Sequence, residues 1–468
     1  MKNSYVPTIG IEVHVELKSL SKVFSNSKNN FNDPVNTNVN VIDLAYPGSL
    51  PRLNKEVINM AIKACLALNC DVTRLMHFDR KNYFYADLPK GFQITQQDTP
   101  IGTNGYIEIE NGKKIRIERL HIEEDTCKSI HSKETLLNFN RAGVPLLEIV
   151  SKPDIHSGLE AVQYVEKLRE TLLYLGISDV KIEEGSMRCD VNVSVSNNDT
   201  LGTKCEVKNI GSISNVKTAI DYEVSRQTEL LKNGEIIKEQ TRRYDDKTKT
   251  TILMRYKETG NDYRYFPEPD IPYFEITDEW IREIEKQMPI LTDELKEKYE
   301  KLNINPQNIQ TLISNRSLCM FLESVIDSVD AVIASNILTS DIAGYLNKNI
   351  VSIEDTKLTK EKFIELINML KNEQLSSKQA KQIIPYLLET DKNISSLIEE
   401  LGLVQITDNT KLQEIINNVL NNNQESVNDY KNGHENALKY LMGQIMKESK
   451  GQANPKLVNE LLIENLKK

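Results

Sequence analysis

The chain has 468 residues, of which 39% are hydrophobic and 27% charged, and its formal net charge is −10. This length exceeds what one hydrophobic core supports, so we expect two to four domains. No stretch approaches the roughly 18 consecutive apolar residues of a membrane-spanning helix, so we expect a soluble protein without a membrane partner. The negative charge gives no overall attraction to nucleic acid, and any contact with RNA would need a local basic patch.

The first residues run directly into an alternating polar and apolar pattern, without the apolar segment and cleavage site of a signal peptide. We therefore expect a cytoplasmic protein. The cysteines form no CxxC pairs, which argues against both a disulfide framework and a structural zinc site. We expect all of them to be reduced: Cys65, Cys70, Cys127, Cys189, Cys205 and Cys319.

Secondary-structure patterns change along the chain. Up to about residue 290, short alternating segments separated by Gly, Pro, Asn and Asp turns predict strands with a few helical inserts. From Leu291 onward, apolar residues recur every three or four positions, as in KEKFIELINMLKNEQ, which predicts helices. From about Thr407 a further helical segment carries an apolar stripe of Leu438, Leu441 and Ile445. The pattern predicts an α+β protein with domains over residues 1–290, 291–406 and 407–468.

Residues 8–17 alternate strictly, so Glu12, His14 and Glu16 are predicted to lie on one face of a strand. For a single strand, a solvent-facing stripe is the more common explanation. The same alternation recurs, however, in SMRCDVNVSV, TKCEVKN and RLHIEEDTCK. These segments add Arg188, Asp190, Asn192, Lys204, Glu206, Lys208, His121, Glu123, Glu124 and Asp125. If the strands share a sheet, its polar face concentrates carboxylates, imidazoles and cations.

Such a face suits phosphate chemistry. Carboxylate oxygens with an imidazole suit Mg²⁺, and nearby Lys and Arg side chains would neutralise a phosphoryl group in transfer. The sequence has no GxxxxGK[ST] motif, so a nucleotide would have to bind at a sheet-based, metal-centred site loosely like that of glutamine synthetase. Periodicity alone does not distinguish this site from a structural polar face.

Two further features suggest RNA. Aromatic and basic residues interleave in FDRKNYFYADLPKGFQITQQD and in RYKETGNDYRYFPEPDIP, a mixture that suits stacking on a single-stranded RNA end, although some of these rings could belong to the core. Between Lys411 and Lys468 there are eight Lys and seven acidic residues, so this stretch is about neutral. Its lysines could contact RNA or form an ordinary solvated face.

Several segments together resemble a known family over nearly the whole chain. They are IGIEVHVEL, FDRKNYFYADLPKGFQI, RLHIEEDTCK, LNFNRAGVPLLEIVSKPD, EEGSMRCDVNVSV, DYRYFPEPDIP and KESKGQANP. The chain resembles the GatB/GatE family, the B subunits of the aspartyl/glutamyl-tRNA(Asn/Gln) amidotransferases. The most diagnostic segment is NRAGVPLLEIVSKPD, because generic folding does not require this mixture of Arg, Gly, Pro and Asp.

The resemblance implies a cradle-shaped, glutamine-synthetase-like catalytic domain, a helical domain and a YqeY-like tail. It implies a heterotrimer in which the B subunit joins an amidase, the A subunit, and a small C subunit. The B subunit would use ATP and Mg²⁺ to phosphorylate the side-chain carboxylate of misacylated Glu-tRNA(Gln), Asp-tRNA(Asn) or both, and glutamine-derived ammonia would displace the phosphate. The sequence shows no glutaminase nucleophile motif, so ammonia is expected from a partner.

The resemblance also implies the site residues. The expected catalytic residues are Glu12, His14, Glu124, Asp190 and Glu206, and the first three are expected to hold Mg²⁺. The expected nucleotide-binding residues are Arg141, Arg188, Lys204 and Lys208. Lys81 and Tyr83 are expected on the ammonia path, with a pairing of Lys81 and Glu124 as a hypothesis. The expected tRNA contacts of the tail are Lys439, Lys447 and Lys450.

One departure from the family concerns zinc. Many members carry a four-cysteine zinc knot early in the chain, where this sequence has Ser25, Ser27, Asn40 and Asp43. Without thiolate ligands, we expect no structural zinc.

Two other functions remain as alternatives. A non-catalytic tRNA-binding scaffold subunit would leave ATP cleavage intact when Glu124 is changed to Gln. A ligase acting on free amino acids would show ammonia-dependent activity without tRNA, and nothing in the sequence favours it.

Overall fold

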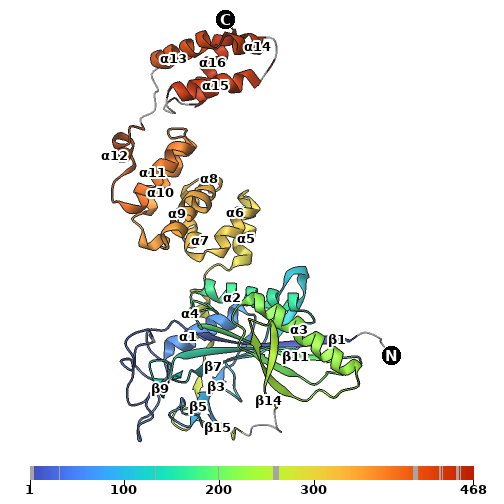
Figure 1. The fold of residues 1–468 in the computed structure, drawn as a ribbon. Coiled ribbons are helices and arrows are strands. Elements are labelled where there is room, and N and C mark those ends of the chain that lie inside the picture. Colours follow the sequence, from blue (N-terminus) through green and yellow to red (C-terminus); the bar gives the residue numbers. More distant parts are fainter. Residues whose placement is uncertain are drawn as a thin grey trace. The chain divides into compact units, whose positions relative to one another are not determined.

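The computed structural model describes residues 5–30, 32–131, 133–198, 200–256, 263–403, 409–431, 434, 436–449, 453 and 455–467. The chain forms two compact units, Met1–Thr292 and Asp293–Lys468 (Figure 1). The first combines a large mixed sheet with helices and the second is built from helices, so the predicted α+β class is confirmed. The boundaries of the three expected domains stay predictions.

In the described part of the first unit, nine strands form one sheet in the order β14-β13-β12-β11-β1-β10-β7-β6-β2. Neighbouring strands run antiparallel, except that β12 and β13 are parallel. The strands are β1 (Val6–Glu16), β2 (Asp71–Val72), β6 (Gly102–Glu108), β7 (Lys114–Glu124), β10 (Pro145–Ser151), β11 (Met187–Ser196), β12 (Cys205–Lys208), β13 (Gln240–Asp245) and β14 (Thr250–Tyr256).

Strand β1 is the middle strand of this sheet and pairs with β11 on one side and β10 on the other. Its apolar residues Ile9, Ile11 and Val13 are fully buried in the core. Since successive side chains point to opposite faces, Glu12 and His14 lie on the other, polar face of the sheet.

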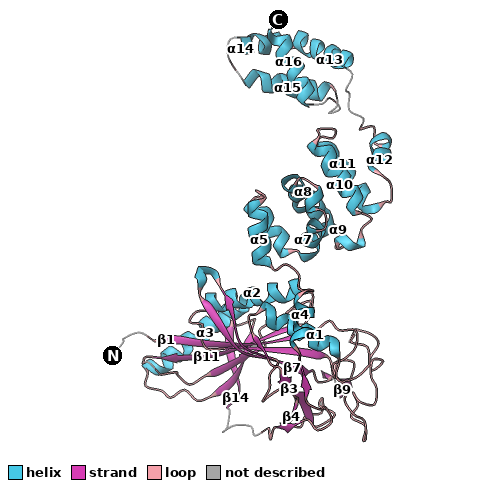
Figure 2. Cartoon of the chain, turned by 180° about the vertical axis from the view of Figure 1, so that it is seen from behind, coloured by secondary structure: helices cyan, strands magenta, loops and turns pink. Residues whose placement is uncertain are grey.

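Helices cover the apolar face, as Figures 1 and 2 show from opposite sides. They are α1 (Lys55–Ala67), α2 (Gly158–Leu175), α3 (Ile213–Lys232) and α4 (Asp278–Glu285). Each begins after a residue whose side chain accepts a hydrogen bond from a backbone N–H of the first turn, which stabilises the helix start. These capping residues are Asn54, Ser157, Ser212 and Thr277.

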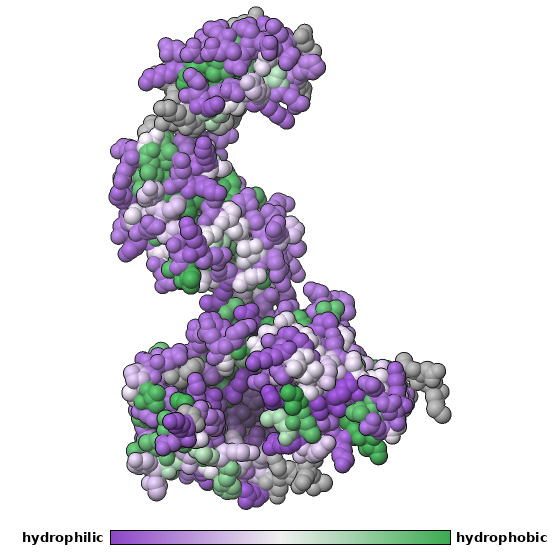
Figure 3. Space-filling model, in the orientation of Figure 1, coloured by the Kyte–Doolittle hydropathy of each residue, from purple (hydrophilic) through white to green (hydrophobic). Residues whose placement is uncertain are grey.

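A smaller sheet lies on the polar side, in the order β15-β4-β5, and its strand β5 packs against β7 (Figure 1). Its strands are β4 (Asp79–Asn82), β5 (Phe92–Thr95) and β15 (Phe266–Pro267). Two further pairs join β3 (Leu75–Met76) to β16 (Phe274–Glu275) and β8 (Lys128–His131) to β9 (Thr135–Asn138). Figure 3 shows a hydrophilic hollow in this unit, which gives a ligand room beside polar side chains.

The second unit contains α5 (Thr292–Lys301), α6 (Pro306–Ser314), α7 (Arg316–Glu323), α8 (Ala331–Ile337), α9 (Ala343–Asn349), α10 (Lys360–Lys371), α11 (Ser377–Glu389), α12 (Ile394–Glu400), α13 (Asn409–Asn422), α14 (Gln424–Lys431), α15 (Asn436–Glu448) and α16 (Pro455–Lys467). Shorter helical segments of the chain are η1 (Glu110–Gly112), η2 (Ile326–Ser328), η3 (Leu338–Ile342) and η4 (Ile353–Asp355).

Helices α13 to α16 share a hydrophobic core of their own. Leu441 and Ile445 are fully buried in it and Leu438 packs against it, so the apolar stripe found in the sequence faces this core. None of the described helices is both long and apolar enough to cross a membrane. The cytoplasmic location stays a prediction.

Candidate active site

A row of polar residues crosses four neighbouring strands on the polar face of the large sheet. Arg188 on β11 lies opposite His14 on β1, His14 opposite Glu148 on β10, and Glu148 opposite His121 on β7. Residues that lie opposite one another in antiparallel strands present their side chains on the same face. Register therefore brings two imidazoles, a carboxylate and a guanidinium together from distant parts of the chain.

Within this row, imidazoles and carboxylates alternate. Glu148 Oε2 lies 3.3 Å from His14 Nε2 and 3.1 Å from His121 Nε2. His121 Nε2 also lies 3.1 Å from Glu123 Oε1. The other ring nitrogen of His121, Nδ1, is buried without a hydrogen-bond partner among the described residues. His121 is thus held by its contacts with the two carboxylates.

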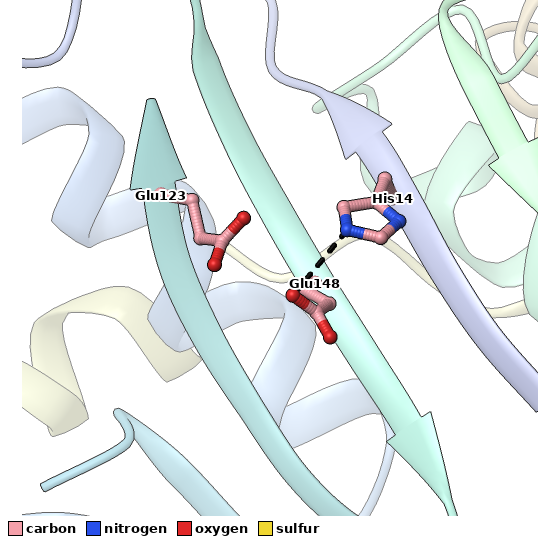
Figure 4. Close-up of side chains that lie close together, drawn as sticks. All are labelled: His14, Glu123 and Glu148. Carbon is pink, nitrogen blue, oxygen red and sulfur yellow. Dashed lines mark ion pairs between the residues drawn. The ribbon is translucent and has the colours of Figure 1, made fainter. Parts of the chain in front are cut away.

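His14, Glu123 and Glu148 converge from β1, β7 and β10 (Figure 4). Each offers one possible ligand atom, and these atoms all lie within 4.8 Å of one another. One imidazole nitrogen and two carboxylate oxygens form a donor set that can hold a divalent cation. A second group in the described residues, His77, Asp79 and Asp98, meets the same distance criterion. Its His77 and Asp79 are already hydrogen-bonded to each other and to the turn at residues 97–99.

Charges within the cluster shift its pKa values in opposite directions. Burial lowers the pKa of His121, but Glu148 and Glu123 outweigh burial and raise it to about 9. Burial likewise lowers the pKa of His14, and the hydrogen bond with Glu148 raises it above its usual value. Burial raises the pKa of Glu148, yet His121 and His14 hold it well below the usual range. The imidazoles and the carboxylates of the cluster therefore each favour the charged form of the other.

The smaller sheet fixes the position of Glu123. Gln93 Nε2 donates to Glu123 Oε2 at 3.0 Å, and Thr95 Oγ1 donates to Glu123 Oε1 at 2.9 Å. Lys81 on the adjacent strand β4 lies in the same region. Burial lowers the pKa of Lys81, but the negative charges of Glu123 and Glu148 raise it overall. Strands β4 and β5 thus support the cluster from the side opposite the large sheet.

A second group of charges lies beside the first on β1, β11 and β12. Lys208 Nζ lies 2.6 Å from Asp190 Oδ2 and 2.7 Å from Glu206 Oε1. Asn192 Nδ2 donates to Glu12 Oε1 at 2.9 Å. Burial, together with the charges of Glu148, Glu206 and Asp190, raises the pKa of Glu12. The structure therefore brings Glu12, Asp190 and Glu206 together, as the sequence predicted for one polar face.

The expected nucleotide-binding cations lie in different surroundings. Arg188 donates to Asp125 Oδ2 at 2.9 Å, and Arg141 Nε lies 3.7 Å from the same oxygen. Lys208 is held between the two carboxylates described above. Lys204 lies 3.8 Å from Glu239 and makes no ion pair with the clustered carboxylates in the described part of the chain. Arg188, Arg141 and Lys208 therefore border the polar face. Lys204 lies farther from the clustered carboxylates and pairs with Glu239 instead.

Glu124 does not join His14 and Glu12. It follows Glu123 on β7, so its side chain points to the other face, where it pairs with Lys90 and accepts a hydrogen bond from the backbone N–H of Ile94 at 3.0 Å. Neither group of potential metal ligands in the described residues contains Glu12 or Glu124. The expected trio of metal ligands is not assembled, and Glu124 pairs with Lys90 instead of the hypothesised Lys81.

Two central residues were not selected from the sequence. Strand β10 is buried at every position, and Glu148 is the only charged residue in its sequence PLLEIVS. The carboxylate inside this apolar run could have identified Glu148 as a candidate site residue, because a buried charge normally requires partners. Glu123 was noted beside Glu124, but alternation could not decide which of two consecutive glutamates points toward the cluster.

The expected tRNA contacts of the tail lie on or after α15. Lys439 and Lys447 are both exposed on this helix. They are eight residues apart, which is slightly more than two helical turns and places them about 80° apart around the helix. Lys450 lies outside the described residues.

At the positions where the resemblance implied a zinc knot, oxygen-containing side chains form hydrogen bonds with one another. Ser25 Oγ donates to Asp43 Oδ1 at 2.7 Å, and Ser27 Oγ donates to Asp43 Oδ2 at 2.5 Å. The backbone N–H of Asn40 donates to Asp43 Oδ2 at 3.0 Å. Lys22 Nζ is fully buried and lies 3.4 Å from the same oxygen. Asp43 thus links Ser25, Ser27, the backbone of Asn40 and Lys22.

The first unit is thus a mixed sheet with helices on one face and, on the other, a cluster of imidazole and carboxylate groups that could hold a divalent cation. Residues 7–282 match the family model of the GatB/GatE catalytic domain, and residues 320–466 match the model described as the GatB domain. The chain therefore belongs to the GatB/GatE family, as its motifs predicted.

Full-length relatives agree with this assignment. The chain is 46% identical over 474 residues to the B subunit of the aspartyl/glutamyl-tRNA(Asn/Gln) amidotransferase of Geobacillus thermodenitrificans, covering 99% of this chain and 100% of the relative. It is 49% identical over 468 residues to the B subunit of the corresponding amidotransferase of Staphylococcus aureus (strain Newman), covering 98% of each chain.

Proposed function

We propose that this chain is the ATP-using subunit of a glutamine-dependent aspartyl/glutamyl-tRNA(Asn/Gln) amidotransferase. It activates the side-chain carboxylate of misacylated Glu-tRNA(Gln), Asp-tRNA(Asn) or both, and ammonia then converts the activated group to the amide. The observation that carries the proposal is the convergence of His14, Glu123 and Glu148 on the open face of a GatB/GatE catalytic domain.

The chemistry explains why ATP is needed. A carboxylate reacts poorly with ammonia because hydroxide, or an oxide ion, is a poor leaving group. In the proposed reaction, a carboxylate oxygen of the substrate attacks the terminal phosphate of ATP, and ADP leaves. Ammonia then attacks the carbonyl carbon of the acyl phosphate, inorganic phosphate leaves, and a proton is lost from nitrogen to give the amide.

The donor set of the site fits Mg²⁺, and His14, Glu123 and Glu148 would hold the ion. Bound there, Mg²⁺ would neutralise negative charge on the phosphate oxygens. His121 keeps Glu123 and Glu148 in place through its two contacts. This arrangement prevents the carboxylates from separating under their mutual repulsion, so the donor atoms stay positioned before a ligand arrives.

Cations beside the cluster would orient the phosphates. Arg188 and Arg141 flank the row of His14 and Glu148, while Lys208 lies next to Glu12 and Asp190. Fixed positive side chains around a developing phosphate charge lower the barrier to phosphoryl transfer. We assign Arg188, Arg141 and Lys208 to the nucleotide. Lys204 is a peripheral contact, and Glu12, Asp190 and Glu206 complete the acidic side of the site.

Ammonia would come from a partner, the amidase or A subunit, held with the small C subunit in a heterotrimer. Support comes from the relatives, which are named as the B subunit of their enzymes, and from the lack of a glutaminase nucleophile motif in this sequence. Lys81 lies 5.0 Å from the Tyr263 ring and 6.0 Å from the Tyr83 ring, near Glu123. We assign Lys81 and Tyr83 to the final part of the ammonia path, and Lys439, Lys447 and Lys450 to contacts with tRNA.

The experiment that tests the proposal compares Glu148→Gln with wild type in the complex purified with its amidase and small subunits. The expected result is loss of both ATP cleavage and amidation of misacylated tRNA, with binding of tRNA preserved. Glu118→Gln changes an exposed glutamate on β7 and serves as the matched control. ATP cleavage that survives in Glu148→Gln would instead support a non-catalytic scaffold.

A further inference from the structure

The second group of potential metal ligands lies beside the first residue of β4. His77 precedes this strand, Asp79 is its first residue, and Asp98 follows β5 in the turn at residues 97–99. One possible ligand atom from each residue lies within 4.8 Å of the other two. The group shares no residue with the cluster of His14, Glu123 and Glu148, so it is a separate feature of the first unit.

Two of these three side chains are buried and held in place. The exposed fraction is 6% for His77 and 1% for Asp79. Asp79 Oδ2 accepts hydrogen bonds from the backbone N–H groups of Gln97 at 2.7 Å and Asp98 at 3.1 Å. Asp79 Oδ1 lies 3.1 Å from His77 Nε2. Neighbouring ligands at about 2.1 Å from an octahedral ion are about 3.0 Å apart, so these two atoms have the spacing of a coordination site.

The hydroxyl of Thr99 decides which nitrogen of His77 carries a proton. Thr99 Oγ1 accepts a hydrogen bond from the backbone N–H of His77 at 2.9 Å and donates its own proton to the carbonyl oxygen of His77 at 3.1 Å. A hydroxyl has only one proton to donate, so none is left for His77 Nδ1, which lies 3.2 Å away. Nδ1 is therefore the donor in its contact with Thr99.

The other ring nitrogen of His77, Nε2, faces a carboxylate oxygen. With a single proton on Nδ1, the imidazole presents a lone pair at Nε2, and Asp79 Oδ1 likewise has only lone pairs to offer. Two acceptors 3.1 Å apart repel each other unless a positive charge joins them. That charge is either a second proton on the imidazole or a metal ion.

Asp98 favours a metal ion over a second proton. One oxygen of its carboxylate converges on the same two atoms, although a protonated imidazole would already have its partner in Asp79. Two carboxylates around one imidazole supply two negative charges, which match a divalent cation. Asp98 is exposed, so water can reach the remaining coordination positions. The ring of Tyr273 covers one face of the imidazole, with 4.5 Å between the ring centroids.

We propose that His77 Nε2 and one carboxylate oxygen each of Asp79 and Asp98 bind a divalent transition-metal ion such as Mn²⁺, with water completing its coordination. The imidazole favours such an ion over Mg²⁺, which is usually bound together with substrate phosphates. The site contains no thiolate and is open to water on one side, so the ion exchanges with the medium and is lost during purification. When bound, it fastens the turn at residues 97–99 to β4.

The test titrates Mn²⁺ into the metal-free full chain and counts the free ion by electron paramagnetic resonance. Wild type is expected to bind one ion more than Asp98→Asn, because the carboxylate cluster is intact in both proteins and any ion bound there is common to them. Mn²⁺ should also raise the melting temperature of wild type more than that of Asp98→Asn. Asp278→Asn, which changes another exposed aspartate of the same unit, is the matched control and should bind as wild type.

Crystals of the full chain soaked in Mn²⁺ locate the ion directly. An anomalous difference peak between His77 Nε2 and Asp79 Oδ1 would support the site. Equal Mn²⁺ counts in wild type and Asp98→Asn, without such a peak, would overturn the proposal and show that His77 carries a second proton instead. Loss of the same ion in Asp278→Asn would place it outside this group and would also overturn the proposal.

Discussion

His121 Nε2 lies 3.1 Å from Glu148 Oε2, and the two residues occupy opposite positions on β7 and β10. The same nitrogen contacts Glu123, so a single imidazole holds two of the three proposed metal ligands. His121 is not itself in the group of potential ligands with His14. Its contribution to the site is therefore to position the carboxylates.

We predict that His121→Leu weakens Mg²⁺ binding by about 10- to 100-fold, the usual effect of losing a residue that orients metal ligands. The carboxylates would lose their shared donor and repel each other. His121→Gln, whose amide nitrogen can replace Nε2, should recover part of the affinity. The measurement is the Mg²⁺ concentration that gives half-maximal ATP cleavage in the assembled complex. Equal Mg²⁺ requirements in all three proteins would contradict a positioning role.

Asp43 provides a second prediction, on stability. Removing it by Asp43→Ala leaves the Lys22 charge buried without its acidic partner and breaks the hydrogen bonds from Ser25 and Ser27. Breaking a buried ion pair in this way costs about 3–5 kcal/mol. The fluorescence of Trp280 reports unfolding of the first unit, because Trp280 is the sole tryptophan of the chain and packs against the core of that unit.

Asp179→Ala is the control for Asp43→Ala. Asp179 pairs with Lys18, and both side chains are more than half exposed, so its removal should change the free energy of unfolding little. Denaturant titration of the full chain gives both values. If Asp43→Ala were as stable as wild type, the network around Asp43 would not stabilise the unit.

The same network predicts that zinc is unnecessary. Ser25, Ser27 and Asp43 satisfy one another, and none of them supplies a thiolate. We therefore expect metal analysis of the purified chain to find well under one zinc per molecule, and a strong zinc chelator to leave its melting temperature unchanged. One tightly held zinc per chain, or a chelator-induced loss of stability, would refute this prediction.

Sequence periodicity predicted one face of the sheet well. A strand exposes alternate residues to opposite faces whatever its neighbours are, so Glu12, His14, Arg188 and Asp190 could be assigned to a common polar face in advance. Periodicity did not show which of Glu123 and Glu124 points toward the cluster. It depends on the register of β7 with β10, where Glu123 lies opposite Leu146, and such long-range pairing is not encoded in a local pattern.

Two other features of the site, Glu148 and the pairing of Lys90 with Glu124, were not predicted from the sequence. Strand β10 is buried on both faces, so its sequence reads as an apolar run, and its single carboxylate, Glu148, indicates a buried charge without indicating that His14 and His121 are its partners. The pairing of Lys90 with Glu124 joins a loop to a strand across 34 positions. The helices of the second unit were easier to predict, because the period of 3.6 residues that indicates a helix is visible within each helix's own sequence.

A last prediction concerns pH and Glu223 on α3. This carboxylate is fully buried, contacts Arg226 and Gln227, and accepts a hydrogen bond from Thr251 Oγ1 at 3.0 Å. Burial raises its pKa, but these hydrogen bonds and the Arg226 charge hold the pKa below the ordinary value of 4.5. As pH falls below about 4.5, the unfolded chain takes up a proton at this position before the folded chain does, so stability is lost.

Glu223→Gln should therefore flatten the decline in stability below pH 4.5. At neutral pH the variant should be about 1.5–3 kcal/mol less stable, since it loses hydrogen bonds to a charged group. Trp280 fluorescence during denaturant titration at several pH values gives both quantities. Glu229→Gln, which changes an exposed glutamate on the same helix, should keep the wild-type slope. An acid slope as steep in Glu223→Gln as in wild type would show that the Glu223 carboxylate does not contribute to this loss of stability.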